Sequence, residues 1–378
     1  MSVINTNVMS LNVQRNLQSS GAALATSLQR LSSGLRINSA KDDAAGLAIT
    51  QRFTTQIRGL DQAARNANDG ISLAQTAEGA MGEITNNLQR IRELAVQSRN
   101  ATNSATDRAA LNAEAQQLKD EINRVASQTS FNGVKLLDGS FTNQAFQVGA
   151  NQGETISVNS IVNANAGSLG TYSRASVTGA AASAFTAITA GDLTINTVNV
   201  GAVAATGDGA SGRASQIRDA INGVSSQTGV YAINDTNTTV TLVSTTADIT
   251  IGLAGTATTA TTGLTAATTA RANTTGFATL DISTTAGADT AMQAMDAALD
   301  AINTARGNMG AIQNRFASVI ANLTTTSENL SAARSRIQDA DYAKETAQLT
   351  RNQILQQAGQ AMLAQANQAP QGVLSLLR

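Results

Sequence analysis

Apolar residues near the N-terminus recur with a helical, heptad-like spacing. The leucines that form this stripe are Leu17, Leu24, Leu28, Leu31 and Leu35. Such spacing places them along one side of a helix, as packing against a partner helix requires. Only Arg15 and Arg30 precede Leu31 as charged residues. We therefore expect a thinly charged helix within residues 1–35 that folds stably only when it packs against partners on more than one side.

The segment 28–49 interrupts this helix and joins it to a second helical region. Small polar residues break the helical pattern in the middle of the segment, and small aliphatic residues resume it afterwards. Asn38 or Ser39 can cap a new helical turn that is entered through Asp42 and Asp43, whose negative charges suit a helix N-terminus. The sequence thus predicts a joint between two packed helical regions.

Residues 57–99 carry a sustained helical repeat. A continuous helix of this length would extend roughly 65 Å at ~1.5 Å per residue. Its glycines weaken it by about 1 kcal/mol each relative to alanine, so tertiary or quaternary packing must hold it straight. These glycines are Gly59, Gly70, Gly79 and Gly82.

Two further repeats complete the helical pattern. One predicts a helix over residues 107–126, and the most regular heptads lie between residues 309 and 337. The simplest topology packs 309–337 against 57–99, and 345–377 against 1–35. Both ends of the chain would then meet, and the middle would be an insertion.

The middle of the chain has a different composition, rich in Thr, Ala, Ser, Gly and Asn between about residues 176 and 275. Alternating apolar and polar residues predict strands at 193–196, 229–233 and 240–243, around a short helix at 214–222. Turn residues near 130–139 predict hairpins just before this region. We expect the Thr-rich tract 256–269 to be an extended surface segment.

Composition excludes several classes of protein. The chain has 378 residues, a formal net charge of −1, and neither Cys, His nor Trp. Without a basic block we expect no nucleic-acid partner, and without His there can be no zinc-protease motif or Ser-His-Asp triad. The N-terminus lacks the pattern of a cleaved signal, and no apolar run is long enough to span a membrane. We expect no enzyme, no cofactor and no metal site.

One motif suggests a nucleotide-binding enzyme as an alternative. Residues 207–212 match G-x-G-x-x-G, lie before the predicted helix, and have Asp235 downstream. A dinucleotide site also needs a parallel β-α-β unit with aliphatic strands, whereas the strands expected here are half polar. We therefore interpret this stretch as a loop. Measurable NAD affinity would be required for the alternative.

Several motifs resemble those of one family. They are SGLRINSAKDDAAGLAI at 33–49, IRGL at 57–60, RNANDG at 65–70, ILQQA at 354–358 and QAN at 365–367. Together they closely resemble bacterial flagellin, the filament subunit of the flagellum. The resemblance is dense from residue 1 to about 170 and from 290 to 378, and weaker between them.

The resemblance implies a mainly α fold: a long antiparallel helical bundle or coiled coil formed by both chain ends, with a smaller, mostly β, α+β outer domain inserted. Residues 1–42 and 343–378 would form the terminal coiled-coil domain of the filament core. Residues 43–175 and 276–342 would form a helical bundle with β-hairpins. The variable, surface-exposed domain would comprise 176–275.

The implied function is structural. A flagellin self-assembles into the hollow helical filament used for motility, is secreted through the flagellar export apparatus, and lies outside the cell. The implied partners are copies of itself, hook-associated and cap proteins, and an export chaperone, with no nucleic acid and no membrane. A hook–filament junction protein is the nearest alternative because it shares the terminal helices. The complete 33–49 motif and the C-terminal motifs favour flagellin.

The terminal stripes bury apolar area only when they pair with each other and with neighbouring subunits. We therefore expect polymerisation to depend on their large apolar residues: Leu17, Leu24, Leu28, Leu31, Leu35, Leu355, Met362, Leu374 and Leu377.

The resemblance also implies recognition by a host Toll-like receptor and by cytosolic flagellin sensors. The residues that match the Toll-like receptor epitope are Arg90, Leu94 and Glu114. At about 100° per residue, Leu94 falls on the side of Arg90, away from the seam that contains Leu88. An equally good alternative is that Leu94 packs against the 107–126 helix or a neighbouring subunit.

Overall fold

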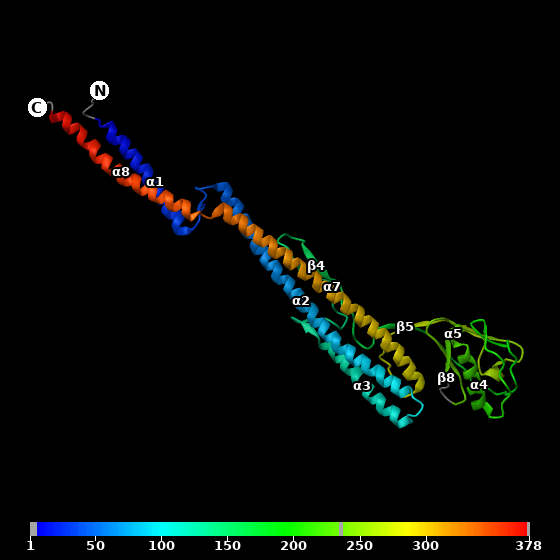
Figure 1. Cartoon of the computed structure of the whole chain (residues 1–378). Coiled ribbons are helices and arrows are strands. Elements are labelled where there is room, and N and C mark those ends of the chain that lie inside the picture. The colour runs from blue at the N-terminus through cyan, green and yellow to red at the C-terminus, as the bar shows by residue number, and fades with distance from the viewer. Residues whose placement is uncertain (1–5, 234–236, 376–378) are drawn as a thin grey trace. The chain divides into compact units, whose positions relative to one another are not determined.

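The computed structural model describes residues 6–233 and 237–375 (Figure 1). It divides into two compact units. One unit combines Met1–Asn68, Phe146–Ile156 and Ala317–Arg378, and the other combines Asp69–Ala145 with Ser157–Phe316. The predicted mainly α fold with a sheet-rich middle is confirmed.

The first unit contains α1 (Val8–Ser33) and α8 (Tyr342–Ser375), which pack side by side in opposite directions (Figure 1). Asn7 caps α1 by accepting a hydrogen bond from the backbone N–H of Ser10 at 3.1 Å. Gly34 ends the helix with φ 72°, in the left-handed region that glycine adopts without steric cost. The predicted pairing of the two chain ends is therefore present.

The same unit contains the beginning of α2 (Ala44–Arg99) and the end of α7 (Thr285–Gln338). Leu60 and Ala63 of α2 form a small core with Leu323 of α7. The hydroxyl of Ser327 donates a hydrogen bond to Asp61 at 3.1 Å, close to this core. These contacts confirm the antiparallel pairing expected between 57–99 and 309–337.

In the second unit, α3 (Ala105–Gln128) joins the other halves of α2 and α7. Ser104 and Asp107 form a capping box at the start of α3. The helical core is fully buried and consists of Met81, Ile84, Leu88, Ile91, Leu94, Ile122, Met295 and Phe316. Glu78 of α2 accepts a hydrogen bond from Gln313 of α7 at 2.8 Å. All three predicted helices are thus present, and α2 and α7 begin earlier than predicted.

Two short hairpins follow α3, as the turn residues predicted. The first pairs β1 (Ser130–Phe131) with β2 (Val134–Lys135), and the second pairs β3 (Gln144–Gln147) with β4 (Thr155–Val158). Asn132 and Gly133 connect β1 to β2 with φ 48° and 82°. Two positive φ values in succession are what a type I′ hairpin turn requires.

The middle of the chain folds around two four-stranded sheets, and the strand pairs that are described in them are antiparallel. In order across the sheet, the first contains β12 (Ala272–Thr275), β5 (Thr171–Thr178), β9 (Thr241–Ser244) and β8 (Val230–Ile233). The second contains β11 (Ala267–Thr269), β10 (Ile249–Leu253), β6 (Leu193–Ile195) and β7 (Val198–Asn199). The remaining helices are α4 (Gly209–Gly223), α5 (Ser225–Thr228) and α6 (Thr259–Thr262).

The core of this region is aliphatic. Ile217 and Ile221 of α4 are buried against Leu193, Ile195 and Leu242 of the sheets. The interpretation of the G-x-G-x-x-G stretch as a loop is wrong for residues 209–212, which form the start of α4, because this helix begins at Gly209 and not at residue 214 as predicted. The strands just before it, β6 and β7, pair antiparallel with each other. This arrangement differs from the parallel β-α-β unit of dinucleotide-binding folds.

The expectation for the Thr-rich tract 256–269 is wrong. It contains α6 and β11, and Thr261 and Thr262 are buried. Thr258 and Thr261 form a capping box, so their hydroxyl groups satisfy backbone groups at the start of α6. Threonine is polar enough to suggest a surface segment by composition, yet its hydroxyl can be satisfied locally and its methyl group buried.

Within residues 6–233 and 237–375, no helix combines the length and the apolar character that crossing a membrane would require.

Gly70 allows close packing of α2 against α7. A Cβ atom on Gly70 would lie 2.6 Å from Cζ of Phe316, whereas one on Gly79 of the same helix would have no neighbour within 4 Å. We expect Gly70→Ala to lower the free energy of unfolding by about 1–3 kcal/mol through overpacking. Gly79→Ala should instead raise it by about 1 kcal/mol because alanine favours the helix.

Urea unfolding followed by circular dichroism at the helical band measures both changes. Equal stabilisation by the two substitutions would contradict the close packing of Phe316 on Gly70.

Candidate assembly interface

Polar contacts hold α1 and α8 in register. Near one end of the pair, the Asn7 side chain donates to the carbonyl of Ala366 at 2.8 Å, and the Ser10 hydroxyl lies 2.9 Å from Asn367 Oδ1. At the other end, the Tyr342 hydroxyl donates to the carbonyl of Leu31 at 2.8 Å. Because these bonds lie at opposite ends of the pair, they fix its antiparallel alignment.

Between these ends the two helices approach closely at a glycine. A Cβ atom on Gly359 would lie 3.1 Å from Leu17 Cδ1, so Leu17 packs directly on the backbone of α8. Arg30 and Glu345 add an ion pair at 3.8 Å. Leu17 is only partly buried by this contact, so the pair leaves much of its apolar surface open.

Exposed apolar side chains concentrate on these two helices. Eight of the eleven large apolar residues that are exposed in the described part of the chain lie on α1 or α8. They are Val8, Met9, Leu11, Leu28, Tyr342, Ile354, Leu355 and Met362. The few buried residues of the pair are small or polar: Ser10, Ser27, Asn352 and Ala366. Such a dense apolar surface marks an interaction site.

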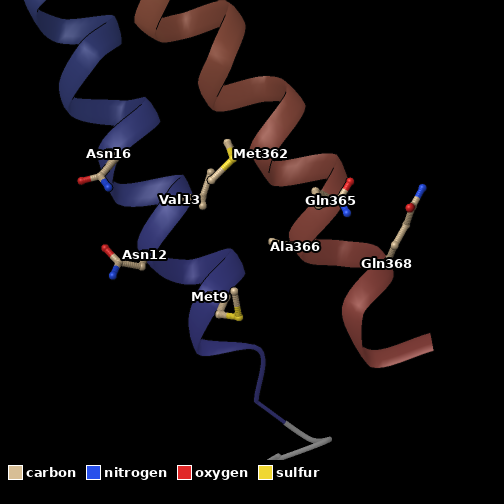
Figure 2. A pocket seen from close by; sticks show the side chains of 8 residues that line it. All are labelled: Met9, Asn12, Val13, Asn16, Met362, Gln365, Ala366 and Gln368. Carbon is tan, nitrogen blue, oxygen red and sulfur yellow. The ribbon is translucent and has the colours of Figure 1, made fainter. Parts of the chain in front are cut away.

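A hollow of about 580 Å³ opens between the two helices, toward their chain-terminal ends (Figure 2). Its lining consists of Met9, Asn12, Val13, Asn16, Met362, Gln365, Ala366 and Gln368. Figure 2 shows Val13 and Met362 pointing toward each other across the gap. Among the described residues no charged side chain lines this hollow, so apolar contact and amide hydrogen bonds are the interactions that these residues offer.

The predicted polymerisation residues have different environments. Leu28, Leu355 and Met362 are exposed. Leu17, Leu24, Leu31 and Leu35 are partly buried. Leu374 lies within α8, and Leu377 lies outside the described residues.

The predicted set omits Val8, Met9 and Ile354, which are among the most exposed apolar residues of the pair. The prediction was based on the heptad-like spacing of leucines, and Val8, Met9 and Ile354 are not part of that spacing. The near absence of charge along both helices is the signal that could have identified them.

The joint between α1 and α2 is hydrogen-bonded to the connection between α7 and α8. The backbone N–H groups of Arg36 and Ile37 donate to the carbonyl of Gln338 at 2.7 and 3.3 Å. The N–H of Ala340 donates to the carbonyl of Gly34 at 2.9 Å. Ile37 is buried at the joint. The two connections therefore act as one unit.

The prediction that Asn38 or Ser39 caps the second helix is wrong. Asp43, directly before α2, accepts a hydrogen bond from the N–H of Gly46 at 2.9 Å and so caps the helix. Asp42 instead accepts from the N–H of Ser39 at 2.9 Å, from the Ser39 hydroxyl at 3.0 Å and from the N–H of Asn38 at 3.2 Å. These bonds from Ser39 and Asn38 lower the pKa of Asp42. Proximity in sequence could not show which acid capped which turn.

The three residues expected at a receptor epitope lie in the second unit. Arg90 forms ion pairs with Glu114 of α3 at 2.9 Å and with Glu93 at 3.1 Å, and all three side chains are about half exposed or more. The Arg90 guanidinium donates hydrogen bonds to the carboxylates of Glu114 and Glu93, and these bonds raise the pKa of Arg90. Leu94 is completely buried within the chain. This agrees with the alternative that Leu94 packs inside the molecule, and Leu94 is not an exposed anchor for a receptor.

Among the described residues, no group of three or more His, Cys, Asp or Glu side chains is placed to hold a metal ion.

Comparison with known families matches both ends of the chain. Residues 4–142 match the bacterial flagellin N-terminal helical region, and residues 292–377 match the bacterial flagellin C-terminal helical region. The chain is 41% identical to Flagellin B of Vibrio anguillarum and 42% identical to Flagellin B of Vibrio cholerae, in each case over 99% of both chains.

Among solved structures, the chain shows a distant similarity to the flagellar junction protein FlgL from Legionella pneumophila. It is 18% identical, the match covers 77% of this chain and 100% of that one, and the TM-score is 0.45. This similarity is too weak to bear on function.

The carboxylate of Asp42 should make the joint sensitive to pH. Its pKa is lowered in the folded state, so its stabilising effect is present above the unfolded-state pKa of about 3.9 and is lost as the pH falls through the folded-state pKa. We expect the parent to unfold at higher urea concentration than Asp42→Ala near neutral pH. This difference should shrink on acidification below about pH 4.

Fluorescent labelling at the joint, combined with urea titration at several pH values, measures this. Ser39→Ala is the control, since it removes only one of the three donors. A difference between parent and Asp42→Ala that stays constant with pH would show that the charge on Asp42 has no role.

Proposed function

This chain belongs to the bacterial flagellin family and is a subunit of the flagellar filament, and from this premise we propose that the α1–α8 pair is the surface through which its copies polymerise. The observation that carries the proposal is the concentration of exposed apolar side chains on these two helices. A surface that contacts a different surface on the next copy, without ring closure, gives a helical polymer of unlimited length.

The energetics support burial of this surface in a polymer. Burying a large aliphatic side chain contributes about 1.5–3 kcal/mol. In the single chain, Leu28, Ile354 and Leu355 are about half exposed, so roughly half of this contribution is still available. By contrast, the helical core of the second unit is already fully buried. Neighbouring copies are therefore a stronger source of stability for the terminal pair than for that core.

The C-terminal segment, residues 343–378, is the part of the pair that assembly should stabilise most. Between residues 343 and 378 the only charged residues are Lys344, Glu345, Arg351 and Arg378. A helix with so little charge and so much exposed apolar surface is marginal by itself. We propose that this segment is largely disordered in the free subunit and becomes a stable helix, paired with α1, in the filament.

The domain division follows from this role. Residues 1–42 and 343–378 would form the filament core, residues 43–175 and 276–342 the surrounding helical bundle, and residues 176–275 the outer surface. The filament lies outside the cell, and we propose that the subunit reaches it through the flagellar export apparatus with the help of an export chaperone. Hook-associated and cap proteins would contact the two ends of the filament. We propose that the role of the subunit is structural and not enzymatic.

A hook–filament junction protein is the less well supported alternative. The sequence identity to the Vibrio flagellins extends over 99% of both chains. The similarity to a junction protein has 18% identity.

A second proposed interaction involves Arg90 and Glu114. Both side chains are exposed and bonded to each other across α2 and α3, so they present one polar patch. We propose that a host Toll-like receptor binds this patch on the free subunit, and that assembly covers it. Host cytosolic flagellin sensors would also recognise the free subunit. Leu94, one helical turn after Arg90 and completely buried, would act indirectly by holding α2 in its packed position.

Deletion of residues 343–378 tests the polymerisation proposal. The truncated chain should form no filaments on seeds, because α1 loses its partner. Its residues 57–337 should keep their helical circular dichroism and cooperative unfolding, because α2, α3 and α7 retain their own core. Electron microscopy of seeded samples measures the outcome. Filaments of normal length from the truncated chain would contradict the proposal.

Replacement of Arg90 by alanine tests the receptor proposal. We expect weaker receptor signalling by the free subunit and weaker filament assembly, because the patch loses its cation. Arg124→Ala is the matched control, since Arg124 is an exposed arginine of α3 that is paired with Glu121.

Leu94→Ala is a less direct test because it should cost about 2–5 kcal/mol of stability by removing buried volume. Receptor signalling by folded Arg90→Ala protein equal to that of the parent would refute the role of Arg90.

A further inference from the structure

We propose that Met9 and Met362 form an oxidation-sensitive site that controls polymerisation of the free subunit. In this proposal, conversion of their thioether sulfurs to sulfoxides in the free subunit makes the surface that α1 and α8 form on assembly more polar and weakens the packing of a second copy on it. The filament in turn protects both residues. This inference rests on the proposed role of the α1–α8 pair in assembly.

The two side chains are the first reason. Met9 of α1 and Met362 of α8 line the same hollow, with Val13 and Ala366 also in its wall (Figure 2). Met9 is 67% exposed and Met362 is 61% exposed. Both sulfurs are therefore accessible to a dissolved oxidant, while they belong to the apolar surface that assembly should cover.

The other methionines provide a contrast within the same molecule. Met81, Met295 and Met309 are almost completely buried in the second unit, and Met292 is partly buried. Susceptibility to oxidation follows exposure. An oxidant should therefore reach Met9 and Met362 well before these three buried methionines and before the partly buried Met292.

The reaction is a two-electron oxidation by a peroxide. The O–O bond of hydrogen peroxide breaks, one oxygen forms a bond to the thioether sulfur, and the other leaves as water. The product is a polar, chiral sulfoxide in place of a flexible apolar group. Methionine sulfoxide reductases reverse the change, one enzyme for each sulfoxide epimer.

The occupant to which we assign the hollow is a second copy of this chain. Its lining residues are all uncharged, so two copies can meet there without repulsion between like charges. Two of its lining residues, Met9 and Met362, also belong to the exposed apolar side chains of α1 and α8 that supply the proposed polymerisation surface. A sulfoxide is much more polar than a thioether, so transferring it from water into such a contact should weaken association about tenfold per oxidised methionine.

The test begins with the parent protein. Free subunits are treated with increasing hydrogen peroxide, and mass spectrometry of peptides gives the sulfoxide fraction at each methionine. We expect Met9 and Met362 to oxidise first, and seeded filament growth to slow in proportion to their oxidation. Treatment with both reductases should restore growth. Pre-formed filaments should show strong protection at these two positions.

Variants then separate the site from general damage. Leucine conserves the volume of methionine and does not form a sulfoxide. The double variant Met9→Leu, Met362→Leu is compared with itself, and its rate of elongation should be the same before and after peroxide. Met292→Leu is the matched control and should remain as sensitive as the parent.

Equal loss of growth in the double variant and the parent would overturn the proposal, as would normal growth of parent subunits oxidised at both positions. If the double variant grows poorly even without peroxide, recovery of oxidised parent subunits with the reductases decides the question. Filament formation by the chain without residues 343–378 would refute the proposed function itself, which distinguishes that failure from the failure of this inference.

Discussion

Antiparallel pairing between segments from opposite ends of the sequence is the interaction on which this structure depends. The helices α1 and α8 are joined by bonds between residues more than 300 positions apart, such as Asn7 with Ala366. Within each unit α2 also packs against α7. No single helix of this kind buries enough apolar surface alone. Each helix becomes stable only when it meets its distant partner, and this contact closes the chain between them into a very long loop. Loop closure costs entropy, but this cost grows only with the logarithm of the loop length.

The α2–α7 pair and the α1–α8 pair differ in which side chains they bury. In the second unit, large side chains such as Leu88 and Phe316 are fully buried, and stability is a property of the single chain. In the α1–α8 pair, small or polar residues occupy the buried positions and the large apolar residues face outward. The same heptad-like pattern therefore gives a fully buried apolar core in the second unit, whereas in the α1–α8 pair it leaves large apolar side chains exposed.

Sequence periodicity predicted the long helices because a repeat of apolar residues over many turns has few alternative explanations. Their pairing did not follow from periodicity and came from the simplest topology, which the resemblance to flagellin also implied. It could not assign caps at the joint, where Asn38, Ser39, Asp42 and Asp43 offer several equivalent hydrogen-bonding patterns. It also misplaced Thr261 and Thr262, which are polar by composition but buried. For Leu94, projection on a single helix could not account for the second neighbour, α3, and whether a side is covered depends on every packed element. The terminal stripe was predicted, but the exposure of Met9 and Ile354 was not, since it depends on side chains that the partner helix leaves uncovered.

The strands β5 and β12 carry the chain into and out of its sheet-rich middle, and they are paired with each other, with Thr171 opposite Thr275 and their hydroxyl oxygens 3.2 Å apart. The two points at which the middle segment is attached are thus held together by the hairpin-like pairing itself. A segment attached at two adjacent points can be lengthened, shortened or replaced without changing the separation that the helices must accommodate. The pairing of β5 with β12 therefore makes the middle an interchangeable part, in which sequence and size can diverge rapidly among lineages while the helical frame stays the same.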